Sequence, residues 1–200
     1  MKKLTALLLA MMMMLCSVAA LADETASDEA REPLIISTNL PIDIQVPNPE
    51  NANVDYYESD GTGYIIYSVG DAEDTTTLQY YVTIAMSDET MLSGKDLADA
   101  TDEEIEELFK TATAYEEGEE QPYTYTVVTF DDGTKALNII DETQRDSAWV
   151  LTVKNGVFVQ VFAWYYDMTA LSDSEIQDAV KLMDDLQFFV KDETTTTAAE

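Results

Sequence analysis

Histidine is absent from this chain of 200 residues, and cysteine occurs once, at position 16. The lack of these residue types excludes Ser-His-Asp and Cys-His catalysis, and it excludes the common zinc sites, which are built from His and Cys side chains. Ser-x-x-Lys, Gly-x-Ser-x-Gly, the P-loop and the dinucleotide-binding glycine pattern are missing as well. The sequence therefore gives little support to an enzyme, and we expect no catalytic residues and no cofactor.

Basic residues are also scarce, with 10 Lys or Arg against 40 Asp or Glu and a formal net charge of −30. Proteins that bind nucleic acid through their surface need a stripe of Lys and Arg to neutralise phosphates, so this function is excluded. The acids all follow residue 22, and few of them fall in the segments that have the pattern of strands. We interpret the charge as a coat that keeps the protein soluble.

The first 22 residues have the pattern of an export signal. Lys2 and Lys3 give a positive start, residues 4–18 form an apolar stretch, and Ala20-Leu21-Ala22 fits the A-x-A cleavage pattern. We predict cleavage after Ala22, with Ala20 and Ala22 as the small residues of the cleavage site.

Two other readings of this segment are weaker. A membrane anchor needs about 20 apolar residues, whereas Thr5, Cys16 and Ser17 interrupt this run. Lipid attachment at Cys16 needs a small residue directly before it, and Leu15 stands there. Cleavage would leave a cysteine-free chain with no stable membrane insertion. We expect a bacterial protein that is secreted or associated with the cell surface.

The rest of the chain reads as one domain with polar ends. Residues 23–33 and 191–200 are charged or Thr-rich and aperiodic, which predicts a disordered leader and a disordered tail. No Pro-, Gly- or Ser-rich linker divides residues 34–190, so we predict a single domain there.

Alternating and β-branched segments predict a largely antiparallel sheet. Residues 77–86 alternate over their whole length, and YTYTVVTF follows at 123–130. Asp132-Gly133 and Asn155-Gly156 are hairpin turn pairs, which places return strands after each of them. The remaining candidate strands are 42–46, 54–58, 64–69, 135–140, 147–154 and 157–166.

Two capping boxes predict helices, Thr101-x-x-Glu104 and Ser172-x-x-Glu175, each followed by apolar residues at helical spacing. A weaker helix is predicted near 94–100, and LQFFV at 186–190 predicts a short closing strand. The segment 157–166 is apolar on both faces, which is typical of a strand buried on both sides. We therefore predict an α+β fold, with a mainly antiparallel sheet of about six strands and helices packed on its faces.

The order of these elements resembles the Mog1/PsbP-like fold family of small secreted bacterial proteins. The resemblance covers residues 40–190, and the matching segments are 54–57, 63–67, 155–159, 174–176 and 186–189. It implies a helix-covered antiparallel sandwich and a non-enzymatic binding or accessory role, with no catalytic residues to carry over.

Clustered carboxylates leave two chemical possibilities open. Asp131-Asp132 and Asp184-Asp185 are the candidate pairs for two-carboxylate glycoside hydrolysis, although neither lies in the apolar setting that raises a pKa. Weak Ca²⁺ binding is the other possibility, because Ca²⁺ prefers oxygen ligands. The candidate loops are 58–61, 70–74 and 116–120, and none has EF-hand spacing.

Adjacent tyrosines occur at 56–57, 80–81 and 165–166, so one ring of each pair should face inward and the other outward in a strand. Outward rings suit a surface that binds a peptide or a sugar, although cross-strand aromatic pairing within the fold is the more ordinary explanation of these rings. We therefore expect an exported binding or accessory module with an unknown protein or glycan partner. The alternative is a secreted carboxylate-dependent hydrolase that acts on polysaccharide.

Overall fold

The computed structural model describes residues 31–71, 73–87, 92–114 and 122–191. The predicted export signal, its cleavage site at Ala20 and Ala22, the leader as far as residue 30 and the tail from residue 192 lie outside this part of the chain.

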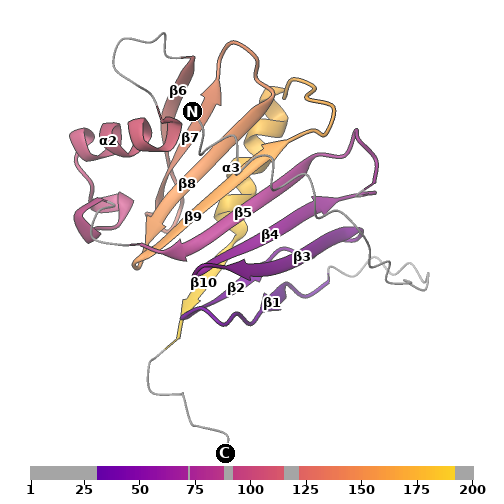
Figure 1. The fold of residues 1–200 in the computed structure, drawn as a ribbon, viewed down its shortest axis with the longest axis horizontal. Coiled ribbons are helices and arrows are strands. Elements are labelled where there is room, and N and C mark those ends of the chain that lie inside the picture. The colour runs from indigo at the N-terminus through magenta and orange to yellow at the C-terminus, as the bar shows by residue number, and fades with distance from the viewer. Residues whose placement is uncertain (1–30, 72, 88–91, 115–121, 192–200) are drawn as a thin grey trace, which may run out of the picture.

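The main sheet has seven strands, all antiparallel, in the order β3-β4-β5-β9-β8-β7-β6 (Figure 1). The predicted turn pairs connect neighbouring strands, and positive φ angles at both Asn155 and Gly156 fit a two-residue hairpin turn. The strands are β3 (Ala52–Ser59), β4 (Thr62–Val69), β5 (Gln79–Met86), β6 (Tyr123–Thr129), β7 (Lys135–Asp141), β8 (Ser147–Lys154) and β9 (Val157–Trp164).

A second, three-stranded sheet joins the two ends of the domain. It consists of β1 (Leu34–Ile36), β2 (Ile42–Val46) and β10 (Gln187–Val190), with β2 in the middle. The closing strand predicted at 186–190 is therefore present, but it pairs with β2 rather than with the main sheet.

Both capping boxes begin helices, α2 (Asp102–Thr113) and α3 (Asp173–Asp185). In each, the side chain of Thr101 or Ser172 accepts a hydrogen bond from the backbone N–H three residues on, and the carboxylate of the Glu at that position accepts one from the backbone N–H of Thr101 or Ser172. Two short 3-10 helices, η1 (Leu92–Gly94) and η2 (Leu97–Asp99), stand where the weaker helix was predicted. The predicted α+β fold with helices on the sheet is confirmed.

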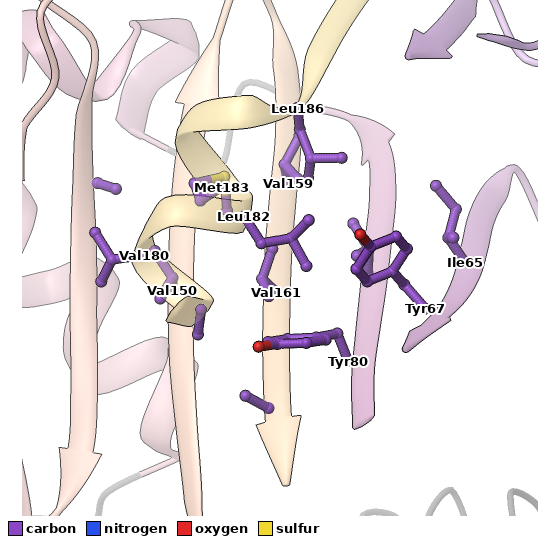
Figure 2. Packing of buried hydrophobic residues seen from close by; sticks show 14 of the residues in the cluster. Ile65, Tyr67, Tyr80, Val150, Val159, Val161, Val180, Leu182, Met183 and Leu186 are labelled. Carbon is purple, nitrogen blue, oxygen red and sulfur yellow. The ribbon is translucent and has the colours of Figure 1, made fainter. Parts of the chain in front are cut away.

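One face of the main sheet, the α3 face, carries the larger core. Figure 2 shows Leu182 of α3 and Leu186, just after the end of α3, above Val159 and Val161 of β9, with Tyr67 and Tyr80 beside them. The small sheet contributes Ile42, Ile44 and Val46 to the same cluster. In Figure 1 the strands of the main sheet cross in front of α3. This face is therefore covered by a helix and a sheet together.

The opposite face, the α2 face, is covered over only part of its width. Under α2, η1 and η2, strands β7 and β8 are buried on both sides, as four successive buried residues in each strand show. In β4, β5 and β9, burial instead alternates along much of the strand. The prediction that residues 157–166 are buried on both sides is wrong, because Phe162 and Trp164 remain partly exposed on this face. No helix in the described residues is long and apolar enough to cross a membrane.

Candidate binding surface

The uncovered half of the α2 face is an aromatic surface, which we call the open face. Strand register sets its composition: residues directly opposite in antiparallel strands lie on the same side, so the rows run across four strands. The side chains that form it are partly or fully exposed, whereas Ser68 and Gln79, in the same row as Trp164, are buried. It consists of Tyr57, Tyr64, Ile66, Tyr81, Thr83, Gln160, Phe162 and Trp164.

The rings of the open face stand against one another. The centroids of Tyr57 and Tyr64 lie 5.0 Å apart with the planes 21° from parallel, and those of Phe162 and Trp164 lie 5.3 Å apart at 29°. Tyr64 in turn contacts Tyr81, at 5.5 Å between centroids. Rings that stack on their neighbours present edges and hydroxyl groups outward rather than flat faces.

Hydroxyl groups tie the tyrosine part of this surface together. Tyr57 and Tyr81 share a hydrogen bond between their hydroxyl oxygens. Burial raises the pKa of Tyr81 above its usual value, and the bond to Tyr57 raises it further. The Tyr81 hydroxyl therefore stays protonated at neutral pH.

The open face carries no positive charge of its own. Strands β3, β4, β5 and β9 contain no Lys or Arg. Asp55 is exposed in the same row as Ile66 and Tyr81. The surface is thus aromatic and polar, with an acidic character that matches the net charge of the chain.

The tyrosine pairs divide as expected. Tyr57 and Tyr81 lie on the open face, whereas their neighbours Tyr56 and Tyr80 pack against the core of the α3 face. The third pair follows the end of β9, where the Tyr165 hydroxyl donates a hydrogen bond to Glu175 and Tyr166 is exposed.

The two predicted acid pairs, which are far apart in the sequence, influence one another in the fold. Partial desolvation raises the pKa of Asp184, which is largely exposed, and the charges of Asp185, Asp132 and Asp131 raise it further. Asp132 also binds Lys154, with 2.5 Å between Oδ2 and Nζ. The pairing was not visible in the sequence, because it depends on where the β6–β7 turn meets the end of α3.

In two of the candidate Ca²⁺ loops, carboxylates accept hydrogen bonds from other groups of the protein. The third loop, at 116–120, lies outside the described residues. Glu58 accepts hydrogen bonds from Tyr56 and from the backbone of Asn39. Asp71 and Asp74 accept from backbone N–H groups two residues on. Among the residues described, no three acidic side chains gather in a way that would hold a metal ion.

Comparison with known proteins gives no further guide. The chain matches no protein-family model, and no curated protein sequence matches it.

Proposed function

We propose that this protein is an exported bacterial binding module, without enzymatic activity, whose open face docks a polypeptide bearing basic and apolar side chains outside the cell. The observation that carries the proposal is the aromatic half of the α2 face, which nothing in the described residues covers. Large apolar patches are uncommon on monomeric proteins and mark interaction sites when they occur.

The ring geometry favours a polypeptide over a sugar on this surface. A sugar ring stacks on the flat side of an aromatic ring, whereas Tyr57, Tyr64 and Phe162 turn their flat sides toward neighbouring rings. Exposed edges and hydroxyl groups instead offer apolar contact and hydrogen bonds, as tyrosines do at protein interfaces.

Charge favours a basic partner. The net charge of −30 and the absence of Lys and Arg from the four strands attract cations and repel anions. A second copy of the same chain brings the same charge, so self-association through this face is opposed by repulsion. A basic polypeptide, in contrast, is attracted by the negative charge of this protein.

The carboxylates give less support to the alternative hydrolase. A general acid needs a raised pKa in an enclosed site. Among the described carboxyl groups with a shifted pKa, that of Asp184 alone is raised, and this residue is exposed. Glu175 lines a groove beside α3, but hydrogen bonds from Tyr165 and Ser172 lower the pKa of its carboxyl group.

Calorimetric titration with synthetic peptides tests the proposal. We expect a peptide of about ten residues that alternates Lys and Phe to bind, and one that alternates Glu and Phe not to bind. Binding should weaken between about 0.05 M and about 0.5 M NaCl, because salt screens the attraction.

Variants assign the binding to a surface. The double variant Tyr57→Ser and Tyr64→Ser should abolish most of the affinity, whereas Ile35→Ser, on an exposed position of β1 away from the open face, should not change it. Equal affinity for the two peptides would contradict the proposal. An equal loss of affinity in the double tyrosine variant and in Ile35→Ser would contradict it as well.

A further inference from the structure

A groove of about 670 Å³ lies on the α3 face, away from the open face. It is lined by α3, by the ends of β4 and β5, and by the segments that flank the small sheet. Its volume falls within the range of about 300–1,000 Å³ that is typical of sites for small molecules.

Two tyrosines form part of the lining. Tyr67 and Tyr80 are 4% and 8% exposed, and their ring centroids lie 5.9 Å apart. Figure 2 shows both hydroxyl groups on the side of their rings nearer to α3. Within the described part of the chain, neither hydroxyl has a hydrogen-bond partner, although the rings pack firmly in the core.

These hydroxyl groups are donors that the fold does not use. Burial raises the pKa of Tyr67 and of Tyr80, and the charges of Asp185 and Asp178 respectively raise them further, so both stay protonated. Although the rings are buried, neither hydroxyl oxygen is sealed inside the protein, because both reach the solvent in the groove. A ligand in the groove can therefore take the place of water as their hydrogen-bond partner.

Carboxylates of α3 line the same groove. Glu175, Asp178 and Asp185 lie three, then seven residues apart, which places them along one side of the helix over about 15 Å. Lys181 forms an ion pair with Asp185, at 2.8 Å, and so offsets one of these charges. The groove thus offers protonated phenols as donors and carboxylates as acceptors.

We propose that this groove binds a neutral, polyhydroxylated ligand such as an oligosaccharide. A hydroxyl group can accept a hydrogen bond from a phenol and donate one to a carboxylate at the same time, so adjacent sugar hydroxyls match both sets of groups. The groove lining has three carboxylates and two cations, Arg31 and Lys181, and Lys181 is already paired with Asp185, so an anionic ligand would meet excess negative charge. An alkylammonium ion would offer no acceptor to the phenol hydroxyl groups. The inference concerns a different face from the open face, and it stands or falls independently of the proposed function.

Three neutral hexasaccharides, cellohexaose, maltohexaose and chitohexaose, serve as probes for the full chain in calorimetric titrations. We expect at least one to bind, and we expect Tyr67→Phe and Tyr80→Phe each to weaken it about 3- to 10-fold, as loss of one neutral hydrogen bond does. Tyr57→Phe, which removes a hydroxyl from the open face, is the matched control and should leave the affinity unchanged.

Stability without ligand gives a second readout. Tyr67→Phe and Tyr80→Phe should melt at or above the temperature of the unmodified protein, because the fold does not use these hydroxyl groups. Tyr165→Phe should melt lower, because its hydroxyl donates to Glu175.

Several results would overturn the inference. The first is that no hexasaccharide binds at about 10 mM, a concentration far above the Kd of typical specific sites. The second is that binding responds to Tyr57→Phe but not to Tyr80→Phe. The third is a clear loss of stability in both groove variants. Loss of the Lys-Phe peptide's binding in Tyr80→Phe would also overturn it, because the groove would then be a peptide site.

Discussion

At the scale of single residues, the helix caps show how a short sequence pattern becomes a stabilising contact. The Thr101 hydroxyl accepts a hydrogen bond from the backbone N–H of Glu104 at 3.3 Å, and the Glu104 carboxylate accepts one from the backbone N–H of Thr101 at 2.9 Å. Lys95 adds an ion pair to the same carboxylate, at 2.6 Å. The cap therefore holds the start of α2 and the segment before it together.

Thr101→Ala should lower the free energy of unfolding by about 1 kcal/mol, as loss of an N-cap side chain does. Thr111→Ala is the matched control, because Thr111 is exposed in the body of α2, where Ala is the better helix former. Urea denaturation should show opposite signs for the two variants. Equal destabilisation by both would mean that the capping contact contributes nothing measurable.

The Asp132–Lys154 pair predicts a pH dependence with a defined sign. Hydrogen bonds from Lys154 and Thr134 hold the pKa of Asp132 well below its usual range. Because the pKa of Asp132 is lowered in the folded state, the stabilisation is fully present above the pKa of the unfolded state, about 4. It is lost as the pH falls through the lower pKa of the folded state.

Asp132→Asn tests this contribution while keeping an acceptor for the N–H of Thr134. The variant should lose about 0.2–1 kcal/mol at pH 7, since the Asp132 side chain is 54% exposed, and the difference should shrink toward zero at acid pH. The charge of Asp132 also raises the pKa of Asp184, so this pKa should fall in the variant, as measured by carboxyl NMR. An unchanged Asp184 titration would show that the two acid pairs are not coupled.

At the scale of elements, the small sheet provides part of the cover that α3 cannot. Ile44 in β2 pairs with Ile36 on one side and Phe188 on the other, and its side chain is fully buried. A strand from each end of the domain therefore meets over the main sheet.

Ile44→Ala should cost about 2–5 kcal/mol, because it opens a cavity in the core. Ile35→Ala is the control, since this side chain, in the adjacent strand, is 61% exposed, and surface changes stay within about 0.5 kcal/mol. Comparison of the two by chemical denaturation should separate them clearly. Similar small effects would mean that the three-stranded sheet is not part of the cooperative core.

The elements that the sequence predicted are those with local signals. Capping boxes placed both helices, and the pairs Asp132-Gly133 and Asn155-Gly156 placed two hairpins. The three-stranded sheet was not predicted, because β2 and β10 pair across most of the chain and neither carries a signal that names its partner. The inward and outward tyrosines were predicted by alternation alone.

The sequence suggested outward tyrosine rings but also predicted cover on both faces of the sheet, and simple dimensions explain why half of the α2 face stays uncovered. Seven strands at about 4.8 Å spacing span about 29 Å, whereas a helix about 10–12 Å in diameter covers roughly two of them. A single helix on each face therefore leaves most of that face to be covered by other elements. On the α3 face the small sheet supplies it, and over β3, β4, β5 and β9 nothing in the described residues does. The two apolar sides of β9 thus correspond to one buried side and one partly exposed aromatic side.

At the scale of the whole molecule, repulsion between carboxylates opposes folding. The formal net charge is −30, whereas the described residues form six ion pairs, all of them at least partly exposed. Exposed pairs contribute about 0–1 kcal/mol each, so attraction between charges is the smaller effect.

Salt should therefore stabilise this protein, although it weakens each ion pair. The Debye length falls from about 30 Å at 0.01 M to about 3 Å at 1 M, which screens the long-range repulsion. We expect the melting temperature to rise with NaCl, by about 2–4 °C for each kcal/mol gained in a domain of this size. A falling melting temperature would show that the ion pairs outweigh the net charge.

Calcium separates screening from specific binding. CaCl₂ at the same ionic strength should raise the melting temperature no further than NaCl does if the carboxylates act as a diffuse charge, as expected from described acids that do not gather around one point. A bound ion stabilises in proportion to the logarithm of its concentration above its Kd, so a specific site would add about 2.7 kcal/mol at one hundred times Kd. A rise that continues with CaCl₂ after NaCl has reached its plateau would contradict the diffuse charge and place a Ca²⁺ site in this protein.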